Sequence, residues 1–575
     1  MSRRGRIVAA VVCAIVVAPS VASAHAYLIK TVPAASGVLD APPPNVHLTY
    51  DEAVEPRFAI ISVTNAAGRQ ETTGPVRRSP ANPDTLVVPL RSGLPQGWYL
   101  IYWRAISVDG HPVQGAFTYA VGPNPGPAPQ FPVPSIAGSA TSLRLLIARW
   151  VMFLSVMSAI GLFVFRILIA RPAARRGPGV SLRIVSRAFV IASVIGLVAI
   201  PVYLDIATAI DSLRSEFDLT ALVPLFRATA FGRGYVDMLA CFALFCAASW
   251  TALWLDRPTR PRRSIAEVMS LVGALLAAGA VLLLPGSAGH AAQTSPRGIS
   301  VALDWVHLVT GSLWLGGLIG LIVLSSSVTA SERVGALSLV VPRFSNVALV
   351  SVVLLLASGT WATINHMPAL DALWLTGYGV AILVKIGLLL AAIALAAGNL
   401  LRTKPRLQAA ARDPERGEPA ARLLRGLISG EAALITAAVF AAAVLSSLAP
   451  PPPAFSLQNS ALANVGPGRV AETIKRAGYE LQVLVSPNKA AAPDSFALRI
   501  TRGGQPVRGA NVTLTFNHTE MQMPQQEYQL TETQPGVYSR AAPALVMVGK
   551  WALDFQITPK TGPGFTALIL DQANG

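Results

Sequence analysis

The sequence predicts a multi-domain membrane protein in which two all-β sandwiches flank a bundle of eight transmembrane helices. Three observations predict this class. Hydrophobic residues make up 53% of the 575 residues and charged residues only 13%, which is too apolar for a wholly soluble chain of this length. Eight apolar windows, each long enough to cross a hydrocarbon core of ~30 Å, lie between residues 145 and 448. The segments on either side alternate between apolar and polar residues instead.

Residues 1–24 have the three parts of a secretory signal peptide. Three arginines precede an apolar run from Ile7 to Val17, and Ala22-Ser23-Ala24 is a small-x-small cleavage site. Cleavage there would make His25 the first residue of the mature protein, with a free amine and an imidazole that could bind one metal ion. An ordinary histidine beside a cleavage site is the alternative, and cleavage after Ala26 would remove His25 altogether.

Residues 25–122 are expected to form the first sandwich, because short alternating runs such as Val46–Tyr50 are separated by turn residues. Near its end, Asp109 and His111 are two residues apart, so in an extended segment their side chains face the same side. With the amine and imidazole of His25 they make three nitrogens and one oxygen. That donor set suits Cu(II).

This part of the chain resembles the CopC family of periplasmic copper-binding proteins. The resemblance rests on four segments: His25-Ala26-Tyr27-Leu28, Thr31-Val32-Pro33-Ala34, Val46-His47-Leu48-Thr49-Tyr50 and Asp109-Gly110-His111-Pro112. It implies a Greek-key sandwich in which His25, Asp109 and His111 are the Cu(II) ligands. The Met-rich Cu(I) site of some CopC relatives is absent, because no Met occurs between His25 and Ser142.

A Pro-rich linker over residues 123–142 precedes the membrane domain, residues 143–448, and a second linker covers residues 449–469. The eight expected spans are Leu145–Ile169, Ala188–Ala209, Tyr235–Leu255, Ile265–Leu284, Val301–Leu324, Phe344–Ile364, Gly377–Leu400 and Leu427–Leu448. The first, third, fifth and seventh connections carry nineteen Lys and Arg, and the others four. The positive-inside rule therefore predicts that both termini and both β domains lie outside the cytoplasm. This distribution explains the net charge of +17, so nucleic acid is not an expected partner.

Ionisable residues within spans are costly and are therefore functional candidates. His290 follows the fourth span, Asp304 and His307 begin the fifth, and His366 ends the sixth. Asp304 and His307 are three residues apart and share a helix face. In the expected topology all four residues lie at the outer mouth of the bundle, where a metal ion would enter. Hydrogen bonding between helices is the alternative role.

Lys385 lies too deep in the seventh span to reach either membrane surface, and we expect a charge partner such as Glu431 or an aspartate of the second or third span. Soft side chains that could carry Cu(I) through the bundle are also available, although methionine on an apolar helix more often fills space. They are Met152, Met157, Met238, Cys241 and Cys246.

The membrane domain resembles the CopD family of copper-associated inner-membrane proteins. The shared segments are Gly289-His290-Ala291-Ala292, Asp304-Trp305-Val306-His307, Trp314-Leu315-Gly316-Gly317-Leu318, Arg343-Phe344-Ser345, Ser358-Gly359-Thr360, and Tyr378-Gly379 leading to Lys385. The resemblance implies transfer of copper across the bacterial cytoplasmic membrane, with His290 and His307 as the foremost ligand candidates.

Residues 470–575 repeat the alternating β pattern and resemble YtkA-like domains, which implies an Ig-like sandwich. They contain Asn517-His518-Thr519-Glu520-Met521-Gln522-Met523. Met521 and Met523 share a strand face, and with His518 they could form a Cu(I) site of thioether and imidazole. The alternative is that both methionines fill the core of a sandwich.

Together these features predict a non-enzymatic protein, embedded in membrane lipid, that captures Cu(II) outside the cytoplasm and passes copper inward. An extracytoplasmic copper donor or reductant and a cytoplasmic copper chaperone are the expected partners. One alternative is a binding-only copper resistance protein. Another is a copper- or haem-dependent membrane oxidoreductase, which is disfavoured because no His lies on the cytoplasmic half of the spans, as a transmembrane haem relay would need.

Overall fold

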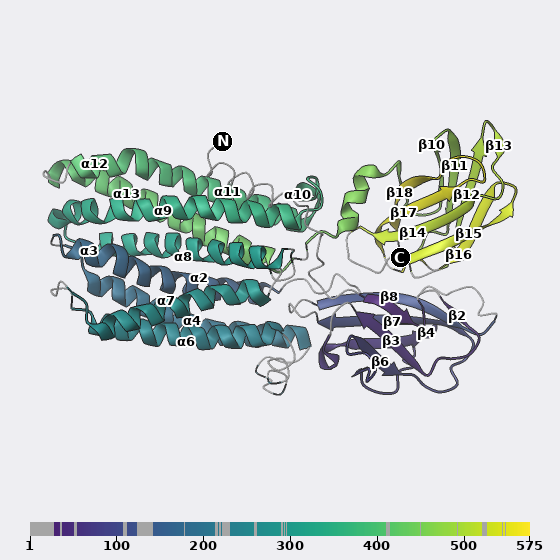
Figure 1. Cartoon of the computed structure of the whole chain (residues 1–575), viewed down its shortest axis with the longest axis horizontal. Helices are drawn as coiled ribbons and strands as arrows, with labels where there is room; N and C mark the ends of the chain where they lie inside the picture. The colour runs from purple at the N-terminus through teal and green to yellow at the C-terminus, as the bar shows by residue number, and fades with distance from the viewer. Residues whose placement is uncertain are drawn as a thin grey trace, which may run out of the picture. The chain divides into compact units, whose positions relative to one another are not determined.

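The computed structural model divides the chain into a helical unit and a β unit. It describes residues 28–34, 37–50, 54–106, 112–123, 142–177, 179–212, 217, 220, 223, 230–257, 262–288, 291, 294, 296–409, 414–448, 450–490, 493–519, 526–542, 544–546 and 548–574. Figure 1 shows the helices of the first unit and the strands of the second. Each part is described by itself below.

The N-terminal β domain consists of two four-stranded sheets. One has the order β1-β3-β6-β5, formed by Leu28–Val32, Asn45–Tyr50, Thr85–Pro89 and Arg77–Arg78. The other has the order β2-β8-β7-β4, formed by Val38–Leu39, Pro112–Val121, Gly97–Ile106 and Ile60–Asn65.

The alternation in β3 explains why these strands pack as layers. Val46, Leu48 and Tyr50 are at most 1% exposed, whereas the intervening His47 is half-buried. Since successive side chains of a strand point to opposite faces, one face of β3 enters the core. The ring of Tyr50 meets Trp103 of β7 edge-on at 5.7 Å between centroids. The all-β sandwich expected for this part of the chain is confirmed.

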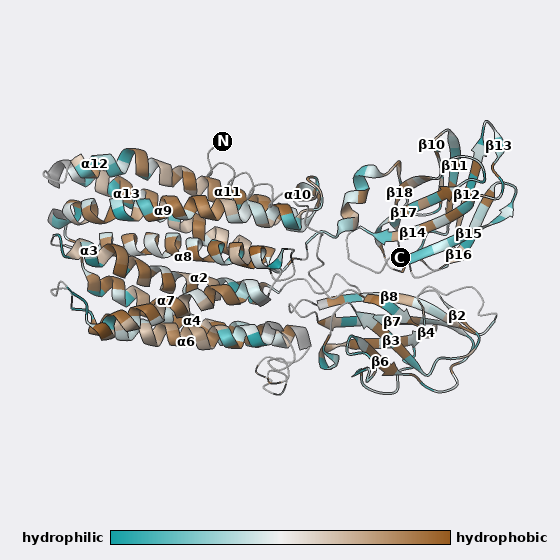
Figure 2. Ribbon diagram, in the orientation of Figure 1, coloured by the Kyte–Doolittle hydropathy of each residue, from teal (hydrophilic) through white to brown (hydrophobic). Residues whose placement is uncertain are grey.

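Eight helices in the described part of the chain are long and apolar enough to cross a membrane, which confirms the eight expected spans. The helices that carry these spans are α2 (Leu143–Phe165), α4 (Leu182–Ser212), α6 (Ala230–Leu255), α7 (Ile265–Ala288), α8 (Arg297–Ser327), α9 (Ala330–His366), α11 (Gly377–Gly398) and α13 (Pro414–Leu445). Shorter helices are α3 (Arg171–Ala174), α10 (Ala372–Leu375) and α12 (Lys404–Ala409), and π-helical segments cover Arg166–Ala170 and Asn399–Thr403. Hydrophobic residues line most of each long helix (Figure 2).

Helices α2 and α8 cross at very short distance because both have glycine at the crossing. A Cβ on Gly161 of α2 would collide with the carbonyl oxygen of Ser312 in α8, and a Cβ on Gly316 would collide with the backbone of Gly161. Small residues at a crossing let membrane helices approach to backbone contact. These two helices are also the most enclosed, with 78% and 67% of their apolar windows buried inside the bundle.

A buried ion-pair network ties four helical segments together where α2 continues into α3. Asp256, just after α6, binds Arg166 Nη1 at 2.7 Å and Arg171 Nε at 2.8 Å, and Arg166 Nε donates to Ser186 of α4 at 2.8 Å. Arg171 also lies 3.9 Å from Glu267 of α7. Burial by itself would raise the pKa of Asp256, but hydrogen bonds from the two arginines outweigh it and hold that pKa below its usual range.

The C-terminal β domain is one continuous ten-stranded sheet folded into a barrel-like sandwich, which confirms the expected all-β fold. Its order is β10-β11-β12-β16-β15-β14-β17-β18-β9, and β13 pairs with β12. The strands are β9 (Ala463–Val465), β10 (Val470–Arg476), β11 (Tyr479–Ser486), β12 (Asp494–Arg502), β13 (Gln505–Pro506), β14 (Asn511–His518), β15 (Gln526–Gln534), β16 (Val537–Ala542), β17 (Gly549–Thr558) and β18 (Phe565–Ala573). Strand β15 pairs with both β14 and β16 and so joins the two layers.

We expect Asp256→Asn to lower the free energy of unfolding of the helical unit by about 3–5 kcal/mol, because it leaves two buried arginine charges without their carboxylate. Glu418→Gln is the matched control, since the Arg333–Glu418 pair has the same 2.7 Å distance but side chains that are 20% and 27% exposed. Loss of the Arg333–Glu418 pair should lower the free energy of unfolding by about 1 kcal/mol or less. The free energy of unfolding of each variant is measured on purified protein in detergent. Equal losses in the two variants would contradict this account of the network.

Candidate metal centre

Six of the ten expected metal ligands lie outside the described residues, so their roles stay predictions. They are His25, Asp109, His111, His290, Met521 and Met523. The strands around two of them are described. Asp109 and His111 belong to the connection between β7 and β8, which pair antiparallel from Ile106 opposite Pro112 onward.

Asp304 and His307 lie one turn apart on α8, as their spacing predicts, and two glycines on neighbouring helices leave room for them. A Cβ on Gly286 of α7 would collide with Asp304 Oδ2. A Cβ on Gly359 of α9 would lie 3.3 Å from His307 Cε1. The close packing of α7 and α9 on α8 therefore encloses both side chains.

The hydrogen bonds of His307 fix which ring nitrogen carries the proton. Its Nδ1 lies 3.0 Å from Ser358 Oγ of α9, and the hydroxyl of Ser358 itself donates to the carbonyl oxygen of Leu354 at 2.8 Å. With its hydroxyl donated to Leu354, the serine oxygen accepts from Nδ1–H, which assigns the ring proton to that nitrogen. The lone pair of Nε2 is left to face the Lys385 ammonium, whose Nζ lies 3.4 Å away.

Lys385 of α11 does not pair with Glu431, and that expectation was wrong. Glu431 accepts a hydrogen bond from Asn399 at the start of the second π-helical segment. Lys385 instead lies beside His307, and it is close enough to Asp304 for the charges of the two side chains to interact. The sequence contains no local signal for this contact, because Lys385 and His307 are 78 residues apart.

Asp304, His307, Ser358 and Lys385 therefore form one polar cluster across three helices, which we term the α8 cluster. It holds a carboxylate, an imidazole nitrogen with a free lone pair, and a cation. The sequence identified Asp304 and His307 from their spacing. It showed Ser358 only as part of a family motif and gave no indication of the room that Gly286 provides.

His366 lies in the last turn of α9 and has different partners. Its Nδ1 lies 2.7 Å from the carbonyl oxygen of Ala362, and its Nε2 lies 3.4 Å from Thr294 Oγ1. It follows Ser358 by eight residues, or about 12 Å along a helix. Within the described residues, no three His, Cys, Asp or Glu side chains are grouped closely enough to hold a metal ion. The structure thus brings together Asp304 and His307, and places His366 elsewhere.

His518, at the end of β14, packs in the core of the C-terminal domain. It is 4% exposed, and its ring meets Trp551 of β17 edge-on at 4.9 Å between centroids. Its Nε2 lies 3.5 Å from the carbonyl oxygen of Val548. Among the soft residues of the helical unit, Met152, Met157, Met238 and Cys246 are buried as well.

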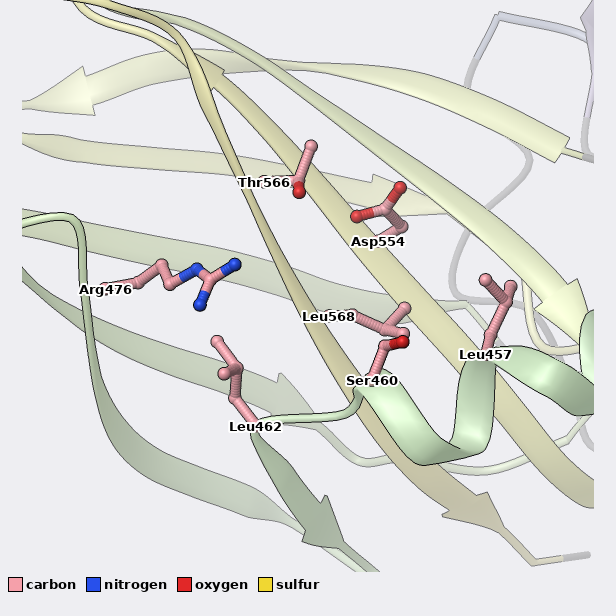
Figure 3. Close-up of a pocket in the computed structure, with 7 residues that line it drawn as sticks. All are labelled: Leu457, Ser460, Leu462, Arg476, Asp554, Thr566 and Leu568. Carbon is pink, nitrogen blue, oxygen red and sulfur yellow. The ribbon is translucent and has the colours of Figure 1, made fainter. Parts of the chain in front are cut away.

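A pocket of about 170 Å³ lies on the outer face of the C-terminal domain, beneath the 3-10 helix η7 (Pro453–Ser460). Figure 3 shows Arg476 and Asp554 at opposite sides of the pocket, with Leu568 on the same side as Asp554. Burial raises the pKa of Asp554 above its usual range. None of the expected metal ligands lines this pocket.

Four models of known domains match the chain in sequence order. The CopC domain matches residues 28–122, and the N-terminal domain of copper resistance protein D-like proteins matches residues 140–298. Copper resistance protein D matches residues 338–445, and the YtkA-like domain matches residues 474–556. The matches therefore cover both β domains and most of the helical unit.

The relatives match either nearly the whole chain or its first domain only. Copper transport protein CutJ of Bacillus subtilis (strain 168) is 26% identical over 539 residues, which are 93% of this chain and 93% of that protein. Copper resistance protein C of Escherichia coli is 33% identical over 106 residues, 17% of this chain and 83% of that protein. The crystal structure of CopC from Methylosinus trichosporium OB3b, at 25% identity and a TM-score of 0.16, covers 19% of this chain and 100% of that one. Through its N-terminal domain the chain belongs to the CopC family, and it carries a CopD domain and a YtkA-like domain in the same polypeptide.

Proposed function

We propose that this protein binds copper outside the cytoplasmic membrane of a bacterium and passes it inward through the helix bundle. The observation that carries the proposal is the His307 Nε2 lone pair, held in place by Ser358 inside an apolar bundle. The full-length relative is named a copper transport protein, and the relatives of the first domain are named copper resistance proteins. None of these names describes an enzyme.

The first step is capture of Cu(II) by the mature N-terminus. The amine and imidazole of His25, the carboxylate of Asp109 and the imidazole of His111 supply three nitrogens and one oxygen, which suit Cu(II). The pairing of β7 with β8 supports this step, because it anchors both ends of the short connection that carries Asp109 and His111. The Lys and Arg distribution of the loops supports placing both β domains outside.

Copper changes oxidation state before it enters the bundle. One electron from an extracytoplasmic reductant converts Cu(II) to Cu(I), which imidazole and thioether ligands accept well. His290 and His366 are the ligands proposed for the entrance to the bundle. The site of His518, Met521 and Met523 in the YtkA-like domain is a second extracytoplasmic holding place for Cu(I).

Inside the bundle, copper and Lys385 compete for the same nitrogen. A cation bound at His307 Nε2 would lie close to the ammonium 3.4 Å away, and two positive charges at that range repel strongly in an apolar environment. Copper therefore binds only when Lys385 turns away or releases its proton. Asp304 stays as the carboxylate that balances whichever cation is present. From here copper passes to a cytoplasmic chaperone.

We expect His307→Ala to reduce copper accumulation on the order of tenfold in cells grown at low external copper, because loss of one good ligand costs about 1.4 kcal/mol or more. Intracellular copper, measured by mass spectrometry at equal protein levels, checks this. His47→Ala is the matched control, since His47 is half-buried on β3 and has no proposed role. If the wild-type protein lowers intracellular copper instead, the protein sequesters or exports copper, and the uptake proposal is wrong.

We expect Lys385→Met to increase the affinity of the purified protein for Cu(I) several-fold, because it removes the competing charge while keeping the length of the side chain. Competition with a chromophoric Cu(I) chelator measures the affinity, and Lys404→Met on α12 is the control. A purely structural lysine would give a different result: the variant would lose stability, through the unpaired Asp304, without binding Cu(I) more tightly. The double variant Asp304→Asn, Lys385→Met separates the two effects.

The N-terminal site predicts one equivalent of Cu(II) with a type-2 electron paramagnetic resonance signal. We expect His111→Ala to abolish this signal, as should an alanine inserted directly before His25, which keeps every side chain but moves the amine away. His47→Ala should leave the signal unchanged. A mature protein that begins at Tyr27, or an unchanged signal in the insertion variant, would rule out this ligand set.

A further inference from the structure

A cluster of buried oxygen atoms lies in the C-terminal domain, apart from all the copper candidates. Asp494 is the first residue of β12, Asp571 lies on β18, and Asn488 lies in the connection before β12. All three residues are at most 1% exposed. Their separation in sequence, 83 residues between Asn488 and Asp571, means that the fold alone brings them together.

Hydrogen bonds fix the orientation of the Asn488 side chain. Its Nδ2 donates to Asp571 Oδ1 at 2.8 Å and to the carbonyl oxygen of Gly468 at 2.9 Å, so both amide hydrogens are used. The adjacent backbone amide of Lys489 donates to Asp494 Oδ1 at 3.0 Å. The same connection is joined to the end of β18 by a bond from Ala490 N to the carbonyl oxygen of Asn574 at 2.7 Å.

One oxygen of each side chain is left without a donor. Asn488 Oδ1, Asp494 Oδ2 and Asp571 Oδ2 are buried and accept no hydrogen bond from the residues that the structure describes. The ion pairs found among those residues include neither aspartate. Burial raises the pKa of both carboxyl groups, and the charge of Asp571 adds to the effect on Asp494. The backbone amides of Asn488 and Gln572 also donate to these carboxylates, but none of the described donors carries a positive charge. A pair of buried carboxylates without a counter-charge is unfavourable, so a positive centre is needed.

A proton and a metal ion would each supply positive charge to the buried oxygens, but they would engage different numbers of them. One proton shared between two oxygens forms one hydrogen bond and leaves the third oxygen without a partner. A metal ion accepts lone pairs from all three. Because every donor is an oxygen and two are carboxylates, the set suits a hard cation rather than copper.

We propose that Asn488, Asp494 and Asp571 bind a hard divalent cation, Ca²⁺ foremost, inside the YtkA-like domain. The ion joins the connection before β12 to β18 and so closes one edge of the barrel-like sandwich. Backbone carbonyls and water complete the six to eight oxygens that Ca²⁺ takes. This site is independent of the proposed copper path, since it shares no residue with it.

Terbium luminescence tests the site in the full-length protein, purified in detergent and stripped with a chelator. Tb³⁺ replaces Ca²⁺ at oxygen sites, and Trp551 lies opposite Asp571 in the β17–β18 pairing, where it can transfer energy to the ion. We expect saturable luminescence on tryptophan excitation that Ca²⁺ displaces. Asp494→Asn and Asp571→Asn should each weaken binding more than tenfold. Asp554→Asn, a half-buried carboxylate on the same strand as Trp551, should leave binding unchanged.

The melting temperature provides a second measurement that needs no variant. Ca²⁺ should raise the melting temperature of the wild-type C-terminal domain, because a ligand that binds only the folded state stabilises it by mass action. The proposal fails if Ca²⁺, Mg²⁺ and Tb³⁺ all leave the wild-type protein unchanged. It also fails if the two Asn variants fold and bind Tb³⁺ as the wild type does. Greater stability of these variants in chelator, with no effect of Ca²⁺ on the wild type, would instead assign the cluster to a shared proton.

Discussion

The helical unit depends on one constraint: a polar side chain placed among apolar helices has to find its partners on neighbouring helices. In the α8 cluster, the partners of the His307 ring come from two neighbouring helices. Ser358 of α9 accepts from the His307 ring, and Lys385 of α11 lies at its other nitrogen. Glycines at the facing positions let α7 and α9 come close enough to enclose the cluster. The contacts that position the polar groups of the α8 cluster are therefore also contacts that pack the helices together.

The same constraint shapes the end of the bundle where α2 continues into α3. There the partners are fully charged, with the carboxylate of Asp256 between two guanidinium groups. The α8 cluster differs because its histidine nitrogen faces a cation instead of an anion or a carbonyl. An ammonium group donates to the lone pair of a neutral imidazole nitrogen, so this contact also joins α8 to α11. In the proposed function, the nitrogen that accepts from Lys385 is the one that copper would bind.

The sequence predicted the features of the fold that repeat along the chain and few of those that depend on distant contacts. Eight spans follow from eight apolar runs, and the strands follow from alternation such as that of β3. The helix ends were less accurate: α9 begins at Ala330, well before the apolar window that starts at Phe344, because Pro342 does not end the helix. The two π-helical segments leave no mark on hydrophobic periodicity. Asp304 and His307 could be paired from their spacing. The contacts of Lys385 with His307 and of Asp571 with Asn488 could not, because these partners lie 78 and 83 residues apart.

The glycine crossing of α2 and α8 has a consequence for the position of His307. The two backbones meet directly at Gly161 and Gly316, so a side chain at either position would push α8 away from α2. Helix α11 packs chiefly against α13 among the described residues, and so depends less on that crossing. Enlarging either glycine would therefore change the distance between His307 and Lys385.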